Sequence, residues 1–302
     1  MQGLRQIFSV ISLLLILASC DDSKKPADTL STGTVEISVD EAYKPIIDEQ
    51  LKVFDSSYPD AHIIIHYKPE SECFKDLFER KTKLILVTRP LTKDEKDYCE
   101  QKQIVPFGEA IAEDAVAVIV NNASPDSMMS TDAIKGILTG VYKNKYTAVF
   151  DNEGSGVVRY ITDTVLQGQK LANNVYAAKS NNAVIDYVEK NEHAIGFLGL
   201  NYVCGPEDSS GTGSFIRNVK VVSVYNDSAK TFYQPYQAVI ALKLYPFTRK
   251  LYYIKSENYP GLGTGFANFL SRERGQLIFA HAHLFPLKMN IIIRDAAINT
   301  DH

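Results

Sequence analysis

The sequence lacks an excess of basic residues. Its 302 residues include 32 Lys plus Arg and 36 Asp plus Glu, which gives a formal net charge of -4. A chain with this balance has no general positive field to attract nucleic acid or an anionic membrane surface, so we expect no nucleic acid partner. A site for an anion would have to be built locally, from a few side chains and backbone amides.

Metal-binding residues are also scarce. The four cysteines occur without the paired spacing of a zinc site, and the six histidines show no ligand pattern. In the stretch HIIIH, His62 and His66 flank a β-branched centre that is typical of a strand, not of a helix that turns both rings toward one metal. We therefore predict no metal and no cofactor. Cys73, Cys99 and Cys204 lie in the body of the chain, where at most one disulfide can form and most are expected to be buried.

A third absence concerns catalysis. A hydrolase needs either a nucleophile with a neighbouring base or a metal site. The sequence shows neither combination, so we predict that the protein is not an enzyme. Outside the first 34 residues there is also no internal repeat, and a content of 45% apolar and 23% charged residues is typical of a globular protein.

The longest apolar run lies at the N-terminus. Residues 1–19 carry Arg5 and then VISLLLILAS, a run too short to span a bilayer comfortably and typical of a signal peptide. The sequence LASC at residues 17–20 resembles the lipobox of bacterial lipoproteins, in which cleavage leaves the cysteine, here Cys20, as the lipid-modified first residue. An ordinary signal peptide that ends near a cysteine is the alternative. Residues 20–34 are polar and turn-rich, as expected of a tether, so we predict a membrane-anchored lipoprotein of a bacterial cell envelope that faces the periplasm.

From Val35 onward, short β-branched runs alternate with amphipathic helical runs. The strand-like runs VEISV, AHIIIHY and LILV are separated by helix-like segments at about residues 43–56 and 72–81. This βαβαβ order predicts a parallel sheet with right-handed crossovers. Parallel sheets bind ligands at the carboxyl ends of their strands, so the loops at residues 40–41, 70–72 and 88–89 should face one crevice.

The composition changes after AVAVIV at residues 115–120, where we predict a crossing into a second domain. A second βα series follows there, with a strand at 146–150, a helix at about 155–166 and a strand-like run at 194–200. The apolar run QAVIALKLYPF at residues 237–247 can return the chain to the first domain. We predict lobe 1 from residues 35–119 and 241–302, lobe 2 from residues 120–240, and hinges near residues 118–121 and 238–241.

The stretch FDNEGSGVVRY at residues 150–160 contains a turn with two glycines, which allow close backbone approach. Ser155 is a natural N-cap for the following helix, whose apolar positions are Val157, Val158, Ile161 and Val165. The first amides of a helix have no intrahelical partner, and together with the helix dipole they form an anion-binding concavity. A plain helix cap is the alternative interpretation.

Several stretches resemble the PstS family of phosphate-binding proteins of ABC transporters. They are LILVTRPLTKDE, IAEDAVAVIVNNASP, GSGVVRYITDTVL, AIGFLGLNYV, and LYPFTRKLYY followed by FANFLSRERGQLIFAHAHLFPLK. The resemblance implies an α/β, two-lobed periplasmic-binding-protein type II fold, in which each lobe is a mainly parallel sheet with flanking helices and two crossover strands join the lobes. It also implies a monomer that captures inorganic phosphate in the cleft between the lobes and passes it to an ABC permease.

Carried over by position, the family's phosphate contacts fall on Glu41, Ser71 or its neighbour Glu70, Thr88, Arg89, Ser155, Gly156 and Val157. Two positions depart from the family pattern. Asp151 stands where well-studied members have an arginine, and Val157 stands where they have a threonine, which loses a hydroxyl but keeps the amide. Thr88 corresponds best to the aspartate that accepts the proton of phosphate in some members.

Two roles are open for Asp151. Either it accepts the ligand's proton while Arg89 supplies positive charge, or Asp151 and Arg89 pair with each other. A carboxylate in the cleft accepts a hydrogen bond from HPO4 and repels sulfate, which has no proton to donate. Asp151, Glu153 and Glu41 are candidates for this selection, and solvated loop acids are the alternative. A sensing or envelope-assembly role, or another small anion as ligand, is the alternative function.

Overall fold

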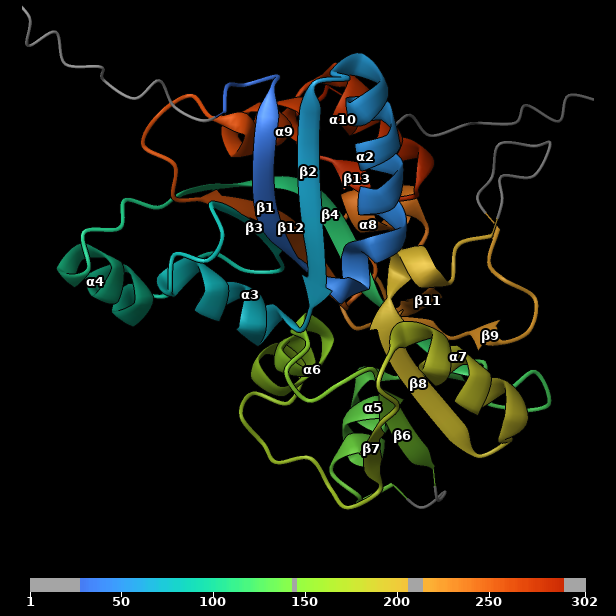
Figure 1. Cartoon of the computed structure of the whole chain (residues 1–302). Coiled ribbons are helices and arrows are strands. Elements are labelled where there is room, and N and C mark those ends of the chain that lie inside the picture. Colours follow the sequence, from blue (N-terminus) through green and yellow to red (C-terminus); the bar gives the residue numbers. More distant parts are fainter. Residues whose placement is uncertain (1–27, 143–145, 206–213, 291–302) are drawn as a thin grey trace, which may run out of the picture.

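The computed structural model describes residues 28–142, 146–205 and 214–290. The predicted signal peptide and Cys20 lie outside these ranges. Within them, no helix is both long and apolar enough to cross a membrane. Figure 1 shows two lobes, one above the other, each with a sheet and flanking helices.

Lobe 1 is a three-layer α/β/α unit. Its sheet has the order β2 (Ala61–Lys68), β1 (Gly33–Asp40), β3 (Leu84–Val87), β12 (Thr248–Lys255) and β4 (Phe107–Val120), and the first three strands are parallel, as predicted. Alternating residues of β3 face opposite core clusters, Leu84 and Leu86 on one side and Ile85 and Val87 on the other. The first cluster is covered by α2 (Lys44–Ser57), α9 (Leu262–Ser271) and α10 (Glu273–His281), and the second by α3 (Glu70–Phe78) and α4 (Lys93–Gln101).

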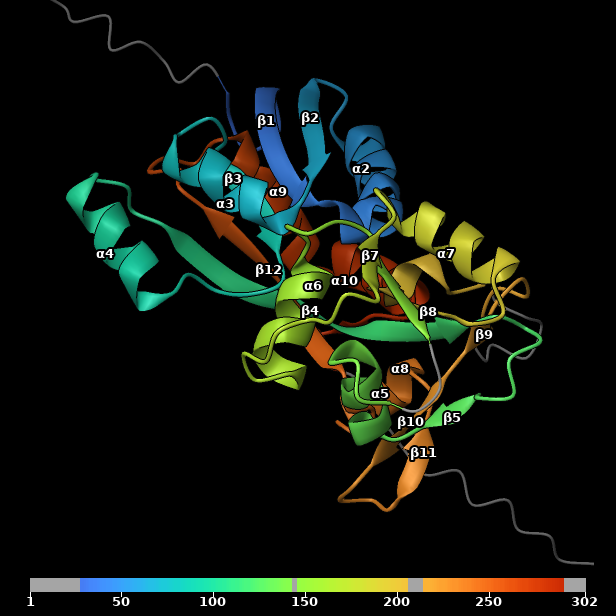
Figure 2. The same cartoon turned by 90° about the horizontal axis from the view of Figure 1, so that it is seen from below.

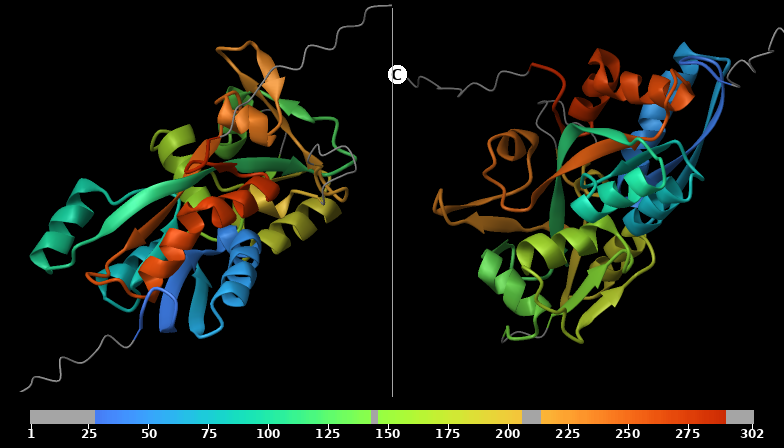
Figure 3. Two further views of the ribbon diagram at one scale, coloured as in Figure 1. Left: turned by 90° about the horizontal axis from the view of Figure 1, so that it is seen from above. Right: turned by 90° about the vertical axis from the view of Figure 1, so that its left-hand side faces the viewer.

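The long strand β4 belongs to both lobes. Up to Ala115 it pairs with β12, and from Val116 onward it pairs with β8 (Ala194–Gly199) of lobe 2. The right-hand view of Figure 3 shows this strand running from one lobe into the other. The chain returns next to it, where the Val116 amide donates to the Phe247 carbonyl at 2.9 Å. The chain therefore crosses between the lobes at residues 115–116 and 247–248, close to the predicted hinge at residues 118–121 and a few residues after the one predicted at 238–241.

The predicted return through residues 238–241 has a different structure. Residues Gln237–Ala241 form a short helix, α8, in which Ile240 is the one fully buried residue. A short apolar run is compatible with a buried strand or with one face of a helix, and periodicity cannot separate the two. The crossing lies a few residues later, at the start of β12.

Lobe 2 builds its own sheet onto the second half of β4. β8, β6 (Thr147–Phe150) and β7 (Val175–Ala177) are parallel, and β9 (Lys220–Val221) also pairs with β4. A separate small sheet contains β5 (Met128–Met129), β10 (Ser223–Asn226) and β11 (Thr231–Tyr233). The helices are α5 (Thr131–Leu138), α6 (Gly156–Tyr160), which continues into η2 (Ile161–Val165), and α7 (Asn181–Lys190). Two short helices, η1 (Glu41–Tyr43) in lobe 1 and η3 (Leu200–Tyr202) in lobe 2, and the short strand β13 (Phe285–Pro286) beside β4 complete the fold.

The end of the predicted tether is part of lobe 1. Asp28 is 2% exposed, and its carboxylate accepts hydrogen bonds from the Tyr259 hydroxyl at 2.6 Å and from the Leu262 amide at 2.7 Å. Leu30 packs so closely against Gly265 that a side chain at residue 265 would overlap its carbonyl. The folded part of the chain therefore begins by Asp28, before the predicted boundary at residue 35.

The HIIIH stretch and three of the cysteines lie in the described part of the chain. The HIIIH stretch forms part of β2, and no group of three or more potential metal ligands occurs in the described ranges. Cys73 and Cys99 are buried, Cys204 is partly buried, and all three are free thiols.

Candidate functional site

The two lobes touch where the carboxyl ends of β1 and β3 face the turn between β6 and α6. In Figures 1 and 2, α6 lies against α3 and the ends of these strands. Among the described residues, six hydrogen bonds cross between the lobes here: Ser71 amide to Gly154 carbonyl (3.2 Å), Asn152 to Glu41 (2.6 Å), Asn201 to the Ala42 carbonyl (2.7 Å), Tyr202 to the Glu41 carbonyl (2.9 Å), Arg159 to Glu70 (2.5 Å) and Arg159 to Thr88 (2.6 Å). The loops at residues 40–41, 70–72 and 88–89 therefore meet the GSG turn in one place.

Ser155 begins α6 as predicted. Its backbone is extended, and its hydroxyl accepts a hydrogen bond from the Val158 amide at 3.2 Å. Gly156 and Val157 are the first two helical residues, so their amides have no carbonyl partner within the helix. The helix start approaches Asp40 at the end of β1, which places these amides between the lobes.

The two lobes approach each other closely at Gly156. A methyl group built on it would overlap the carboxylate of Asp40 and lie 2.8 Å from the Thr88 hydroxyl oxygen. Both neighbours belong to lobe 1, whereas Gly156 belongs to lobe 2. Glycine is needed here for space and not for backbone conformation, since this residue does not have a positive φ.

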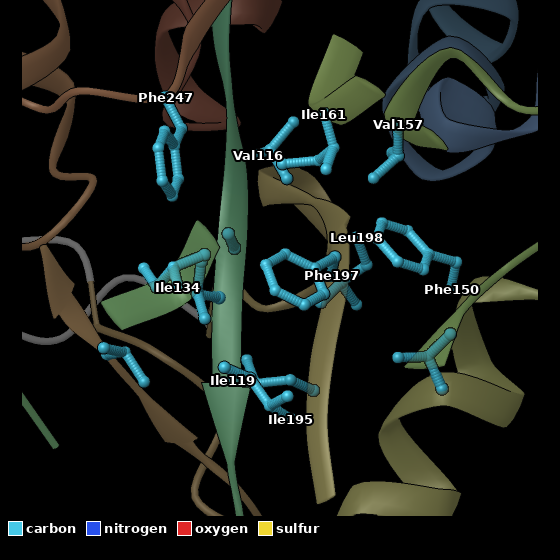
Figure 4. Packing of buried hydrophobic residues seen from close by; sticks show 14 of the residues in the cluster. Val116, Ile119, Ile134, Phe150, Val157, Ile161, Ile195, Phe197, Leu198 and Phe247 are labelled. Carbon is cyan, nitrogen blue, oxygen red and sulfur yellow. The ribbon is translucent and has the colours of Figure 1, made fainter. Parts of the chain in front are cut away.

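The side chain of Val157 points away from the lobe junction. It is fully buried in the core of lobe 2, where Figure 4 shows it with Ile161 and Phe150. Phe150 stacks on Phe197 with ring centroids 4.9 Å apart. Residue 157 can therefore offer only its amide to a ligand, and an apolar side chain fits this position better than a hydroxyl.

Thr88, Glu70 and Arg159 form a hydrogen-bonded group across the junction. One oxygen of Glu70 accepts from the Thr88 amide at 2.6 Å and from the Thr88 hydroxyl at 2.5 Å. The other oxygen accepts from Arg159 Nε at 2.5 Å, while Arg159 Nη2 lies 2.6 Å from the Thr88 hydroxyl. Of the two predicted alternatives for the α3 loop, Glu70 therefore faces this group, and Ser71 contributes its amide to the neighbouring lobe contact.

The structure does not bring the guanidinium of Arg89 to this group. Arg89 makes a two-pronged ion pair with Glu95 of α4, at 2.6 and 2.7 Å, and stacks on the ring of Phe74 at 3.8 Å. It shares with these residues a surface groove of about 550 Å³ between α3 and α4. Arg159, one helical turn after Ser155, lies at the junction in place of Arg89, and Asp151 and Arg89 do not pair with each other.

Two buried carboxyl groups face the junction. Asp40, at the end of β1, is fully buried: Oδ1 accepts from the Ala42 amide at 3.0 Å, and Oδ2 has no partner within the described part of the chain. Burial raises the pKa of Asp40 to about 8, the charges of Glu70 and Asp151 add to this shift, and Arg249 opposes it. Asp151 is also fully buried: Asn181 donates to Oδ2 at 3.4 Å, Oδ1 has no partner among the described residues, and burial raises the pKa of the carboxyl.

The other candidate acids differ in their surroundings. Burial and the charge of Asp151 raise the pKa of Glu41, whose carboxylate accepts from the Asn152 amide group at 2.6 Å. Glu153 is exposed, as the solvated-acid interpretation predicts. The sequence interpretation chose Glu41 over its neighbour Asp40, although Asp40 is the more deeply buried of the two.

A buried ion pair lies beneath the junction. Arg249 donates from Nε to Asp114 Oδ2 at 2.9 Å, and the two side chains are 1% and 0% exposed. The two residues are direct neighbours in the β4–β12 pairing, next to the crossing between the lobes. Sequence reasoning did not select Arg249, although it lies within LYPFTRKLYY, one of the stretches that carried the resemblance. Its position predicts that it supports the junction with positive charge.

The raised pKa of Asp40 makes stability depend on pH. The folded protein holds a proton on Asp40 up to about pH 8, whereas the unfolded chain releases it near the ordinary value of 3.8. The contribution of Asp40 to the free energy of unfolding is fully present below pH 3.8. It is lost as the pH rises toward 8, by up to about 1.4 kcal/mol per pH unit. Urea unfolding at pH 5 to 8 should therefore show a steeper decline for the wild type than for Asp40→Asn. The exposed Asp186→Asn should keep the wild-type slope, and an equal slope in Asp40→Asn would show that Asp40 ionises normally.

Comparison with known proteins places this geometry in a family. The model of the PBP superfamily domain matches residues 25–274. The chain belongs to the PBP superfamily. Among curated relatives, protein SphX of Synechococcus elongatus is 21% identical over 88% of this chain and 82% of its own length, and the phosphate-binding protein PstS of Staphylococcus saprophyticus is 23% identical over 87% and 82%.

A solved structure shows the same fold as this PBP superfamily member. It is a phosphate ABC transporter substrate-binding protein of Clostridium perfringens with bound phosphate, which is 23% identical and covers 85% of this chain and 100% of its own, with a TM-score of 0.71. The two-lobed α/β fold and the likeness to PstS proteins predicted from the sequence are confirmed.

Proposed function

We propose that this protein binds inorganic phosphate, or a closely related tetrahedral oxyanion, between its lobes and delivers it to an ABC permease. The observation that carries the proposal is the meeting of Thr88, Arg159 and the first turn of α6 at Gly156. These groups offer a hydroxyl, a guanidinium and unbonded amides from two lobes to one point. Membership of the PBP superfamily and the phosphate-binding relatives support the same function.

In this proposal each group has a distinct task. The amides of Gly156 and Val157 and the hydroxyl of Ser155 bind oxygens at the helix start, where the helix dipole also favours negative charge. Thr88 donates from lobe 1. Arg159 supplies the charge that the sequence interpretation assigned to Arg89, since its guanidinium is the one at the junction.

The buried acids give the proposed site its selectivity. Asp40 and Asp151 each have one buried oxygen without a partner. An ionised carboxyl can accept the proton of hydrogen phosphate, whereas sulfate has no proton to donate and would be repelled. Asp40 holds its own proton up to about pH 8, so we propose Asp151 for this role. We expect phosphate to bind more tightly than sulfate for this reason. Glu41 and Ser71 contribute through the contacts that hold the lobes together.

Comparison of two arginine variants tests the function and the assignment of charge. Charge-assisted hydrogen bonds contribute about 1.5 to 3 kcal/mol, so Arg159→Gln should weaken phosphate binding about ten- to hundredfold. Arg89→Gln, the matched control, should bind as the wild type does because its side chain is paired with Glu95. The measurement is isothermal titration with phosphate and with sulfate. If Arg89→Gln loses more affinity for phosphate than Arg159→Gln does, Arg89 and not Arg159 is the cation that binds the ligand. A wild-type protein that binds no phosphate would favour the sensing or envelope-assembly role.

We also propose that the mature protein is a lipoprotein held to the membrane through Cys20. Seven residues lie between Cys20 and Asp28, which is already packed on lobe 1, so eight Cα–Cα steps join the two. Such a segment reaches at most about 28 Å, so lobe 1 would stay close to the bilayer surface.

The anchor can be tested by replacing the modified residue. Cys20→Ser removes the sulfur that carries the lipid, so the protein should move from the membrane fraction to the soluble fraction after cell lysis. Cys204→Ser, which changes a partly buried thiol in lobe 2, is the control and should stay with the membrane. Retention of Cys20→Ser in the membrane fraction would contradict the anchor.

A further inference from the structure

One carboxylate of the protein takes the donors that the proposed ligand would use. Glu70 is 2% exposed, and its two oxygens accept from the amide and hydroxyl of Thr88 and from Arg159, all within 2.6 Å. One backbone amide, one hydroxyl and one guanidinium thus surround a negatively charged group. This is the set of contacts that a bound oxyanion makes in a protein.

The same contacts bridge the lobes. Glu70 is the first residue of α3 in lobe 1, and Arg159 lies on α6 in lobe 2. The side chains in this ion pair are 2% and 25% exposed, so water screens the attraction only in part. The pair therefore favours contact between the lobes by itself, without a bound anion.

We propose that Glu70 is an internal occupant of the oxyanion site, which a ligand must displace from Thr88 and Arg159 in order to bind. The inference rests on the proposed function, because it takes Thr88 and Arg159 as ligand contacts. As part of the chain, Glu70 is present at these donors at a high effective concentration. It lowers the affinity for every anion that uses them.

Competition with Glu70 also selects among ligands. A free monocarboxylate brings the same charge and the same planar pair of oxygens as Glu70, so it gains nothing by replacing it. A tetrahedral dianion brings more charge and further oxygens that reach the amides of Gly156 and Val157. Glu70 thereby favours phosphate-like dianions over monocarboxylates.

The test is isothermal titration of Glu70→Gln with inorganic phosphate and with sulfate. The variant keeps the size of the side chain but removes its charge, so the affinity for both anions should rise about tenfold or more. Glu72→Gln is the matched control, since it makes the same change two residues later in α3 at a side chain that is 51% exposed. It should bind both anions as the wild type does.

A second variant separates competition from a merely structural role. If Glu70 competes for Arg159, the gain from Glu70→Gln should shrink severalfold in an Arg159→Gln background, because the shared donor is gone. If Glu70 only supported the Thr88 loop, Glu70→Gln would instead weaken phosphate binding in both backgrounds. If Glu70→Gln fails to fold, Glu70→Asp replaces it: the shorter side chain cannot reach both lobes as well, and the affinity for phosphate should again rise.

The outcomes distinguish this inference from the proposed function. Wild-type protein that binds phosphate, with unchanged or weaker binding in folded Glu70→Gln, would overturn the role of Glu70 and leave the function intact. Tighter binding in Glu70→Gln than in the wild type supports both. Absence of phosphate and sulfate binding in both proteins at millimolar concentration would overturn the function, and the inference with it.

Discussion

Gly156→Ala is expected to weaken phosphate binding about ten- to hundredfold while the protein stays folded. The added methyl group would overlap the Asp40 carboxylate and crowd the Thr88 hydroxyl, so the lobes could not approach each other as they do here. Crowding a tightly packed contact costs about 1 to 3 kcal/mol, and about 1.4 kcal/mol is a factor of ten in affinity. The fold itself should tolerate the change, because alanine is the better helix former and the backbone at residue 156 has no positive φ.

Titration, thermal unfolding and small-angle scattering check this expectation together. With saturating phosphate, the variant should keep a larger radius of gyration than the wild type, since binding between two lobes requires them to close. Gly136→Ala in α5 is the control, because its new methyl group would meet only ordinary contacts of 3.5 Å or more. Wild-type affinity in Gly156→Ala would show that the lobes need not meet at Gly156 and that the ligand binds elsewhere.

The features that could be predicted from the sequence depend on local order along the chain. Ser155 could be recognised because an N-cap needs only a suitable side chain at the right place before an apolar helical pattern. The parallel order of β1, β2 and β3 followed from the alternation of runs, and the crevice followed from that order. Such predictions need no knowledge of which distant residues touch.

The parts that could not be predicted depend on side-chain direction or on the packing of distant segments. Arg89 follows a strand end, as an oxyanion ligand should, yet Glu95 and Phe74 hold its guanidinium in another groove. Arg159 reaches the junction only because α6 of lobe 2 faces α3 of lobe 1. The choice of cation was therefore decided by tertiary contacts that a single sequence does not show.

Asp40 is a different case, because a local signal was present. In β1, Val35, Ile37 and Val39 point into one core, so the period of two places Asp40 on the opposite face of the sheet. That face carries α3 and the end of β3, which is where the junction lies. The alternation could therefore have favoured Asp40 over Glu41.

Arg249→Met is expected to lower the free energy of unfolding by about 3 to 5 kcal/mol. Removing one partner of a buried ion pair leaves the other as an uncompensated charge, and Asp114 is fully buried at 0% exposure. Asp40 and Asp151 lie close enough for the charge of Arg249 to act against their raised pKa values, so its loss should make these carboxyls still harder to ionise. Arg249 thus stabilises the crossing between the lobes and also the ionised forms of Asp40 and Asp151.

Urea unfolding at neutral pH measures the loss, and two variants show its origin. Replacing both partners, as Asp114→Leu with Arg249→Met, should recover most of the stability, because an apolar pair of similar volume often replaces a buried ion pair at little cost. Lys52→Met, which breaks a pair with Glu49 whose side chains are 69% and 58% exposed, should change stability by less than about 1 kcal/mol. If Arg249→Met were as mild as Lys52→Met, water or another cation would have to reach Asp114, and the proposed support of the junction by Arg249 would be wrong.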